Sequence, residues 1–193
     1  MTGLQFLSRI AVSILVLFVQ AAAQAQDVRF PGSVQLKTYT SKKYAVTIGL
    51  PESWVLDAPI RNEIWLAFGE IRGAWSGCFV RMSEVQYAGL SKPEELFASV
   101  DQKKFIEMNS VSMPDIKVHV YDIAYLSGRK ARRVVYSGTD SGVKTGAVSY
   151  QALDGDRTFT VSCFSKASQF SLLYNDFEQI ISSFRFLTNS RAR

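Results

Sequence analysis

The sequence predicts an α+β fold in which a mainly antiparallel sheet is sandwiched by helices, with the C-terminal helix packed on the sheet. Three observations support this prediction. Short segments of alternating apolar residues, separated by turn residues, recur along most of the chain. One helical pattern interrupts these segments, and a regular apolar stripe near the C-terminus indicates a second helix. Runs of strands with helices between and after them are typical of layered α+β architectures.

The first 25 residues have the layout of a secretory signal peptide. An apolar run at residues 10–19 follows Arg9, and Ala23-Gln24-Ala25 is a small-x-small cleavage site. An uncleaved anchor is the alternative, but this run is well below the ~20 residues that span a bilayer. We expect cleavage after Ala25, and a periplasmic or secreted mature chain without a transmembrane segment.

The mature chain, residues 26–193, has the size of one domain. It comprises 168 of the 193 residues, and we expect its core to cover about residues 34–187. The signal peptide contains one Arg and no acid, so cleavage lowers the net charge from +5 to +4. Outside the cytoplasm this charge favours headgroups or polysaccharide over nucleic acid, and it also suits ordinary solubility.

Two strands are expected first, at residues 34–39 and 44–50. The second (YAVTIGL) alternates apolar residues with small or polar ones, which predicts one buried face. Pro51 cannot donate to a sheet ladder, so pairing should stop there. Trp54 follows, where its ring can cover the core and keep its N–H near a partner.

Two more strands are predicted at residues 63–71 and 77–84. Residues 72–77 between them contain two glycines and indicate a hairpin loop. The residues expected to share an apolar face are Ile64, Leu66 and Phe68 in the first strand and Cys78, Val80 and Met82 in the second.

A helix is predicted from Ser91 to about Asn109. Ser91 and Glu94 form a capping box, and Pro93 lies in the first turn, where its missing N–H costs nothing. The expected apolar face consists of Leu96, Phe97, Val100, Phe105 and Met108.

Hairpins and a terminal helix complete the prediction. The C-terminal helix should be capped by Ser168 and followed by a polar end at residues 188–193. The expected strands are residues 116–126, 130–138, 145–153 and 158–165, with turns at Ser127-Gly128, residues 139–142 and Asp154-Gly155-Asp156. The helical stripe is Phe170, Leu173, Phe177, Ile180 and Phe184.

The strand that ends in Leu-Pro-x-x-Trp, from Leu50 to Trp54, resembles the PsbP-like and DcrB-like exported bacterial proteins. So does the late block YLSGRKARRVVYSG…YQALDGDRTFTVSC…FEQIISSFRF. The resemblance covers most of residues 34–187. It implies a PsbP-like α/β/α sandwich and an accessory, interaction-type role in larger assemblies. It supplies no catalytic residues, and a fold likeness is not itself a function.

The chain offers few candidates for catalysis or metal binding. His119 is the only histidine, and its strand pattern places it with Lys117 and Tyr121, which suits a surface position. A general base or metal ligand would need partners beside it. Either Cys78 or Cys163 could pair with it as a nucleophile, but a thiol on an apolar strand face is inert.

Two charged features have simpler structural interpretations. Asp154 and Asp156 flank a glycine and suit a turn better than a calcium loop. The densest charge is the group Arg129, Lys130, Arg132 and Arg133. This group could dock on an anionic surface, or its side chains could fan to both sides of a strand and lie over apolar neighbours.

The two cysteines predict a disulfide bond. Cys78 shares a face with Val80, and Cys163 shares one with Val161, so both side chains should point inward. In an oxidising compartment, Cα atoms within about 7 Å would allow a Cys78–Cys163 bond. Two separate buried thiols are the alternative.

These observations favour an exported, non-enzymatic accessory domain that binds a protein partner or the envelope surface, without a cofactor. The alternative is a small-ligand-binding protein or weak hydrolase with a pocket between sheet and helix. A cleft that contains His119, Tyr121 or paired acids would favour the alternative. A flat, exposed aromatic or basic patch would favour the accessory role.

Overall fold

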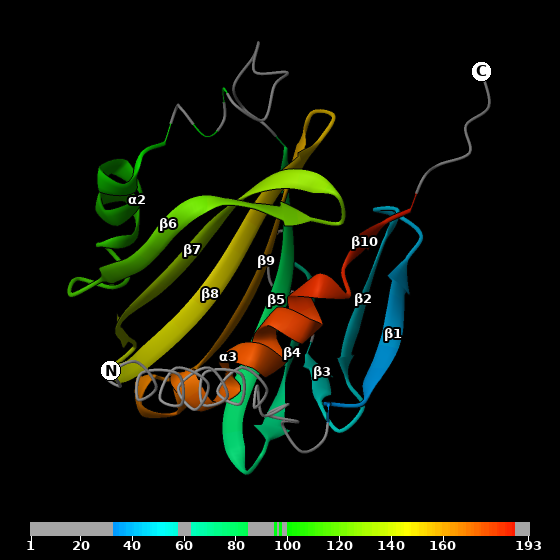
Figure 1. Ribbon diagram of the computed structural model, residues 1–193, viewed down its shortest axis with the longest axis horizontal. Coiled ribbons are helices and arrows are strands. Elements are labelled where there is room, and N and C mark those ends of the chain that lie inside the picture. The colour runs from blue at the N-terminus through cyan, green and yellow to red at the C-terminus, as the bar shows by residue number, and fades with distance from the viewer. Residues whose placement is uncertain (1–32, 58–62, 85–94, 96, 98–99, 188–193) are drawn as a thin grey trace, which may run out of the picture. The chain divides into compact units, whose positions relative to one another are not determined.

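The computed structural model describes residues 33–57, 63–84, 95, 97 and 100–187. From Val34 onward they belong to one compact unit. Two antiparallel sheets and the C-terminal helix α3 (Ala167–Ser182) enclose its hydrophobic core (Figure 1). The predicted fold class, a mainly antiparallel sheet with the C-terminal helix packed on it, is confirmed.

The larger sheet has seven strands in the order β3-β4-β5-β9-β8-β7-β6. Each neighbouring pair is antiparallel. The short strand β3 was absent from the sequence-based prediction, and its three residues are all exposed. The strands are β3 (Val55–Asp57), β4 (Glu63–Ile71), β5 (Ala74–Glu84), β6 (Lys117–Leu126), β7 (Arg129–Asp140), β8 (Val143–Asp154) and β9 (Arg157–Lys166).

Tight turns connect three of the hairpins. Arg72-Gly73, Ser127-Gly128 and Ser141-Gly142 each have positive φ at both residues, from 49° to 82°. Such type I′ turns match the twist of the flanking strands, so pairing continues up to the turn. The expected loop at residues 72–77 is therefore wrong, because Ala74 already pairs with Ile71. The turn expected at residues 139–142 is likewise shorter, because β7 extends to Asp140.

The predicted apolar face of β4 is wrong at Ile64, whereas Leu66 and Phe68 share a face as expected. A β-bulge between Glu63 and Trp65 shifts the alternation of its side chains. Ile64 is buried in the main core, whereas Leu66 lines a cavity on the opposite face of the sheet. One extra residue in a strand moves every later side chain to the other face, and composition does not reveal where it is inserted.

The smaller sheet has three strands in the order β1-β2-β10. Pro51 is the last residue of β2 and lies opposite Leu36. The two-residue strand β10 was not predicted. It follows α3 directly and pairs with the start of β2. The strands are β1 (Leu36–Ser41), β2 (Val46–Pro51) and β10 (Arg185–Phe186).

Helix α3 packs against β8 and β9 of the larger sheet and against β2 of the smaller one. Leu173, Phe177 and Ile180 are buried, as the apolar stripe predicts. Phe184 is buried too, but it follows the last helical residue, Ser182. The expected cap at Ser168 is wrong: the N-cap is Lys166, without a side-chain capping hydrogen bond.

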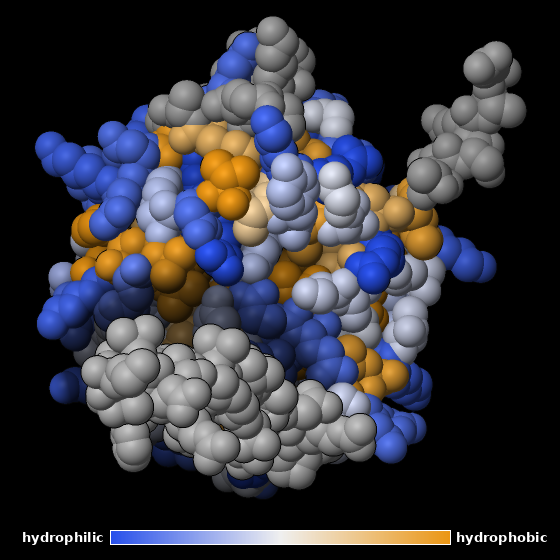
Figure 2. All heavy atoms as spheres, in the orientation of Figure 1, coloured by the Kyte–Doolittle hydropathy of each residue, from blue (hydrophilic) through white to orange (hydrophobic). Residues whose placement is uncertain are grey.

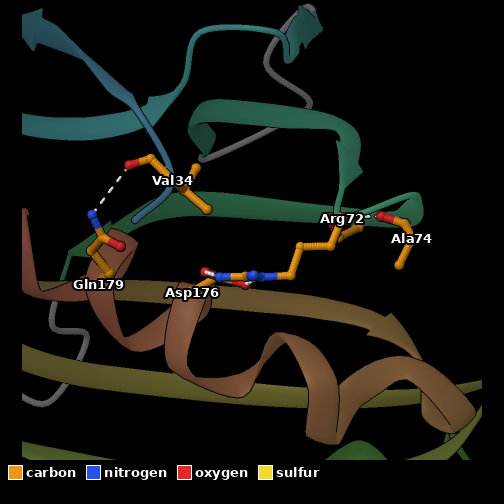
Figure 3. Close-up of polar contacts among 6 residues, drawn as sticks. Val34, Arg72, Ala74, Asp176 and Gln179 are labelled. Carbon is orange, nitrogen blue, oxygen red and sulfur yellow. Dashed lines mark hydrogen bonds and ion pairs between the residues drawn. The ribbon is translucent and has the colours of Figure 1, made fainter. Parts of the chain in front are cut away.

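Polar contacts attach the exposed end of the β4–β5 hairpin to α3 (Figure 3). Asp176 is only 4% exposed. It accepts hydrogen bonds from Arg72 Nε at 2.8 Å and from Arg72 Nη2 at 3.2 Å. This pairing raises the pKa of Arg72. Gln179 Nε2 donates to Val34 O at 3.2 Å, which ties α3 to the chain just before β1.

Helix α2 (Gln102–Asn109) begins later than predicted. Residues 95 and 97 are helical, but a new helix starts at its N-cap Asp101, whose Oδ1 accepts from Lys104 N at 2.8 Å. The prediction of one continuous helix through residue 101 is therefore wrong. Met108, which was expected on the apolar face of that helix, is exposed. The predicted first turn, with Ser91, Pro93, Glu94 and Leu96, lies outside the described residues.

Trp54 is buried in the core, as expected. The hydrogen bond expected from its indole N–H is not observed in the described part of the chain. Trp54 Nε1 has no hydrogen-bond partner among the residues that the structure describes. The expected signal peptide and the polar end at residues 188–193 lie outside those residues. None of the helices within the described ranges is long and apolar enough to cross a membrane.

Candidate functional site

The face of the seven-stranded sheet that points away from α3 contains a cavity of about 460 Å³. This volume is within the range of small-molecule sites in proteins. Its walls come from β4, β5, β7, β8 and β9 and from the segment that follows α2. The main apolar walls are Leu66, Trp75, Phe79, Met113, Tyr136 and Phe164.

The cavity arises from a row of alternating large and small residues across five strands. In strand order the row is Phe68, Gly77, Phe164, Ala147 and Tyr136. A Cβ atom at Gly77 would be 2.7 Å from Phe164 Cζ, so only glycine allows this ring to lie so close to β5. Small side chains between large rings leave space above the sheet.

Trp75 lies at the edge of this cavity and is 48% exposed. Its ring stacks on Phe68, with centroids 6.2 Å apart, and lies 6.0 Å from the ring of Phe164 at an angle of 57°. Offset and tilted aromatic pairs of this kind stabilise each other beyond simple burial. The cavity therefore has a preformed aromatic wall with one face in solvent.

Six residues with polar side chains contribute to the lining: Tyr136, Asp140, Thr145, Ser162, Ser165 and Lys166. Ser162 is 1% exposed, and its Oγ has no partner of hydrogen-bond geometry within the described part of the chain. Burial raises the pKa of the neighbouring Tyr136 phenol, and the Ser162 hydroxyl opposes that shift in part. Asp140 and Lys166 contribute one charge of each sign.

The residues singled out from the sequence lie elsewhere. His119 is exposed at a β-bulge in β6, with Nε2 2.7 Å from Ser137 Oγ. Tyr121 donates from its hydroxyl to Val100 O at 2.5 Å. Neither residue lines the cavity. The cleft is thus concave, as the ligand-binding alternative requires, but it lacks the side chains expected in it.

Cys78 and Cys163 form a disulfide bond, in agreement with the prediction. They lie directly opposite each other on β5 and β9, with Cα atoms 4.0 Å apart. Both are buried on the face that α3 covers. Because both thiols are bonded, a thiolate–His119 pair is excluded in this state.

The four basic residues of β7 do not form one surface. Arg129 Nη2 lies 2.8 Å from Asp154 Oδ1. Arg133 Nε donates to Asp122 Oδ1 at 2.9 Å, an interaction that raises the pKa of Arg133. Alternation along the strand places Arg132 and Lys130 on the opposite face from these two residues.

Arg132 is buried beneath the segment that precedes α2. Its Nη2 donates to Phe97 O at 3.0 Å, and its guanidinium lies 5.4 Å from the ring centroid of Tyr121. Burial lowers the pKa of Arg132. Lys130 is exposed. This distribution agrees with side chains that fan to both sides of the strand.

A second polar cluster lies between α3 and the strands β6 to β8, where Figure 2 shows hydrophilic residues in a recess of the surface. Tyr150 donates from its hydroxyl to Glu178 Oε2 at 2.8 Å. Burial is the main cause that raises the pKa of Tyr150, and the hydrogen bond and charge of Glu178 raise it further. The same two causes raise the pKa of Tyr174 to about 12. Both phenols therefore remain protonated hydrogen-bond donors at neutral pH. No group of three or more metal-binding side chains occurs within the described ranges.

The cavity was missed by sequence reasoning, although β5 carried a signal for it. Trp75 and Phe79 alternate there with Ala74, Cys78 and Val80, so both faces of the strand are largely apolar. A strand with one solvated face normally alternates apolar and polar residues. The aromatic residues on the second face thus indicated a second apolar surface.

Together, the sheets, α3 and the cavity define an α+β sandwich with a binding-type concavity. The structure is similar to cyanobacterial PsbP (CyanoP) from Synechocystis sp. PCC 6803, with 12% identity, 81% of this chain and 95% of that chain covered, and a TM-score of 0.58. The expected PsbP-like fold is confirmed.

Two further solved structures share this fold. LpqN of Mycobacterium tuberculosis, described as involved in cell envelope biogenesis, has 10% identity over 78% of this chain and 90% of that chain, with a TM-score of 0.55. A Pseudomonas aeruginosa protein of unknown function, described as a putative regulator, has 10% identity over 77% and 95%, with a TM-score of 0.51. No family model and no curated protein matches the sequence.

Proposed function

We propose that this protein is an exported, non-enzymatic accessory domain that binds its partner through the aromatic cavity on the seven-stranded sheet. The observation that carries this proposal is the exposed aromatic edge of the cavity, where Trp75 is 48% exposed. Aromatic side chains that are held by their neighbours bind an apolar group with little loss of conformational entropy.

Export is supported by two features of the chain. Residues 1–25 have the layout of a cleaved signal peptide, which would leave residues 26–193 as a single domain in the periplasm or outside the cell. The Cys78–Cys163 disulfide is typical of oxidising compartments. The fold similarity to a protein described as involved in cell envelope biogenesis agrees with a partner at the envelope.

Small-ligand binding is the second candidate function, and the cavity volume of about 460 Å³ favours it specifically. The two functions share the same surface. They differ in whether the apolar group that enters the cavity belongs to a macromolecule or to a free compound.

Site-specific photo-crosslinking in the native envelope tests the accessory role. A photoreactive residue would replace Val143, which lines the cavity and is 48% exposed. The control position is Leu172, which is 60% exposed on α3. We expect a reproducible adduct from position 143 and none of the same mass from position 172.

A cavity-filling variant makes this test specific. Ala147 is buried in the cavity wall, and Ala147→Leu would occupy part of the volume. The adduct from position 143 should then be lost, while circular dichroism shows a folded protein. An adduct that persists in folded Ala147→Leu protein would contradict a cavity-mediated role.

A further inference from the structure

We propose that the cavity binds a single-chain amphiphile with an anionic head, and that Lys166 at the start of α3 holds the head. The inference rests on the second candidate function, small-ligand binding in the cavity, and adds the chemical class of the ligand. It combines three features: an apolar wall of suitable volume, a lysine that lines the wall at the start of α3, and a buried hydroxyl that makes no hydrogen bond of normal geometry among the described residues.

The tail of the amphiphile would lie against the apolar wall. The wall combines the flexible side chains of Leu66 and Met113 with the flat rings of Phe79, Trp75 and Phe164. A surface of this composition gains affinity from each methylene group that it removes from water. An aliphatic chain can therefore fill an irregular hollow between rings.

The positive charge lies at one end of the same wall. Lys166 lines the cavity and is also the N-cap of α3, a helix of 16 residues. This helix has no side-chain capping hydrogen bond and no acidic residue in its first turn. The positive end of the helix dipole and the lysine thus reinforce each other, an arrangement that favours a bound anion.

The third feature is Ser162 on the same face of β9. It is 1% exposed, it lines the cavity, and its Oγ has no partner of hydrogen-bond geometry among the described residues. The Tyr136 phenol interacts with this hydroxyl without a hydrogen bond of normal geometry, so a polar group inside the hollow would stabilise it further. An amphiphile supplies such a group at its head end.

Asp140 is the competing charge. It lies beside the β7–β8 turn, at the same end of the sheet as Lys166, and accepts a hydrogen bond from Ser141 Oγ at 3.1 Å. If Asp140 determined the specificity, an amphiphile with a cationic head would bind better. The α3 N-terminus adds to the charge of Lys166 and opposes that of Asp140, and this favours the anionic head.

The test uses three probes of equal chain length: decanoate, decanol and decyltrimethylammonium. Isothermal titration of the mature protein should show decanoate binding about fivefold tighter than decanol, because one partly exposed charge pair and a helix N-terminus give effects of this size. The cationic probe should bind most weakly. Octanoate should bind about 15-fold more weakly than decanoate, since each buried methylene contributes about fourfold.

Matched lysine variants identify the group that holds the head. Lys166→Gln should remove most of the preference for decanoate and leave decanol binding unchanged. Lys144→Gln makes the same change at an exposed lysine that does not line the cavity, and it should have no effect. Ala147→Leu should weaken all three probes.

Four results would overturn the proposal: no binding of any probe, equal affinity for the three heads, preference for the cation, or equal effects of Lys166→Gln and Lys144→Gln. These outcomes are distinct from failure of the accessory role. A cavity-dependent crosslink in the native envelope would still support that role if the protein bound decanoate no better than decanol.

Discussion

Trp54 packs directly over Gly69, where a Cβ atom would be 2.6 Å from Trp54 Cδ1. Any larger residue at this position of β4 would force the buried indole to move, and a packed interior resists such shifts. Both residues are visible in the sequence, but their contact is not. The position of a large side chain is thus decided by a small one fifteen positions away.

Asp115 illustrates how a single carboxylate couples the fold to pH. Its Oδ1 accepts from Thr139 N at 2.5 Å and its Oδ2 accepts from Thr139 Oγ1 at 2.8 Å. These two bonds, the backbone one first, hold the pKa of Asp115 below its usual value. A lowered pKa in the folded state contributes stability above the unfolded pKa of about 4, and this stability is lost as pH falls through the folded value.

We therefore expect Asp115→Asn to reduce the pH dependence of stability on the acid side. The measurement is the difference in urea midpoint between about pH 6 and about pH 3, which should be smaller for Asp115→Asn than for the native sequence. Thr139→Val should give an intermediate difference, because the backbone N–H of residue 139 remains. An unchanged difference in Asp115→Asn would refute the role of this carboxylate.

At the scale of elements, α3 connects the two sheets because its buried apolar surface is wide enough to contact both of them. Leu173, Phe177, Ile180 and Ile181 are all buried, and the helix contacts β2, β8 and β9. Ser183 at its C-terminus accepts a hydrogen bond from Gly49 N at 2.7 Å, which fixes the end of the helix against β2. The helix is thus central to both layers.

Truncation of one side chain on each side of α3 tests this packing. Phe177 is fully buried, so Phe177→Ala should lower the free energy of unfolding by about 3–5 kcal/mol through lost burial and a residual cavity. Asn175 is exposed, so Asn175→Ala should change it by well under about 1 kcal/mol. Equal shifts in a denaturant series would contradict the observed orientation of the helix.

At the scale of the whole molecule, the disulfide links two strands that are 85 residues apart in sequence. β5 and β9 are central neighbours in the seven-stranded sheet, so the bond joins the early and late parts of the chain through the middle of the core. A covalent link across so long a loop restricts the unfolded chain strongly, and the chain-entropy account of this effect predicts about 4.6 kcal/mol.

The corresponding prediction concerns thiol content and stability together. Protein purified without reductant should show no reactive thiol under denaturing conditions and two after reduction. Replacing both Cys78 and Cys163 by Ala should lower the free energy of unfolding by about 5 kcal/mol, most of it from the lost covalent link and the rest from lost core packing. Two free thiols in the unreduced, denatured protein would contradict the bond.

The sequence alone determined most of the local structure. Alternation predicted the strands of the hairpins, Ser127-Gly128 marked a turn, and the stripe that includes Leu173 and Phe177 predicted α3. The order of these elements, with the Leu-Pro-x-x-Trp segment, also indicated the PsbP-like fold. These features depend on neighbours within about one turn of helix or one hairpin, so a short window of residues contains the information.

The tertiary structure decided the features that depend on register and on distant pairing. The bulge beside Trp65 places Ile64 on the opposite face of β4 from Leu66, and Asp101 caps a new helix. Arg72 pairs with Asp176, which is 104 positions away in the sequence. The cavity formed only when pairing brought Gly77, Phe164 and Ala147 into one row. Which residues meet across strands depends on the packing of the whole chain, because periodicity within a strand is the same for every register that buries the same face.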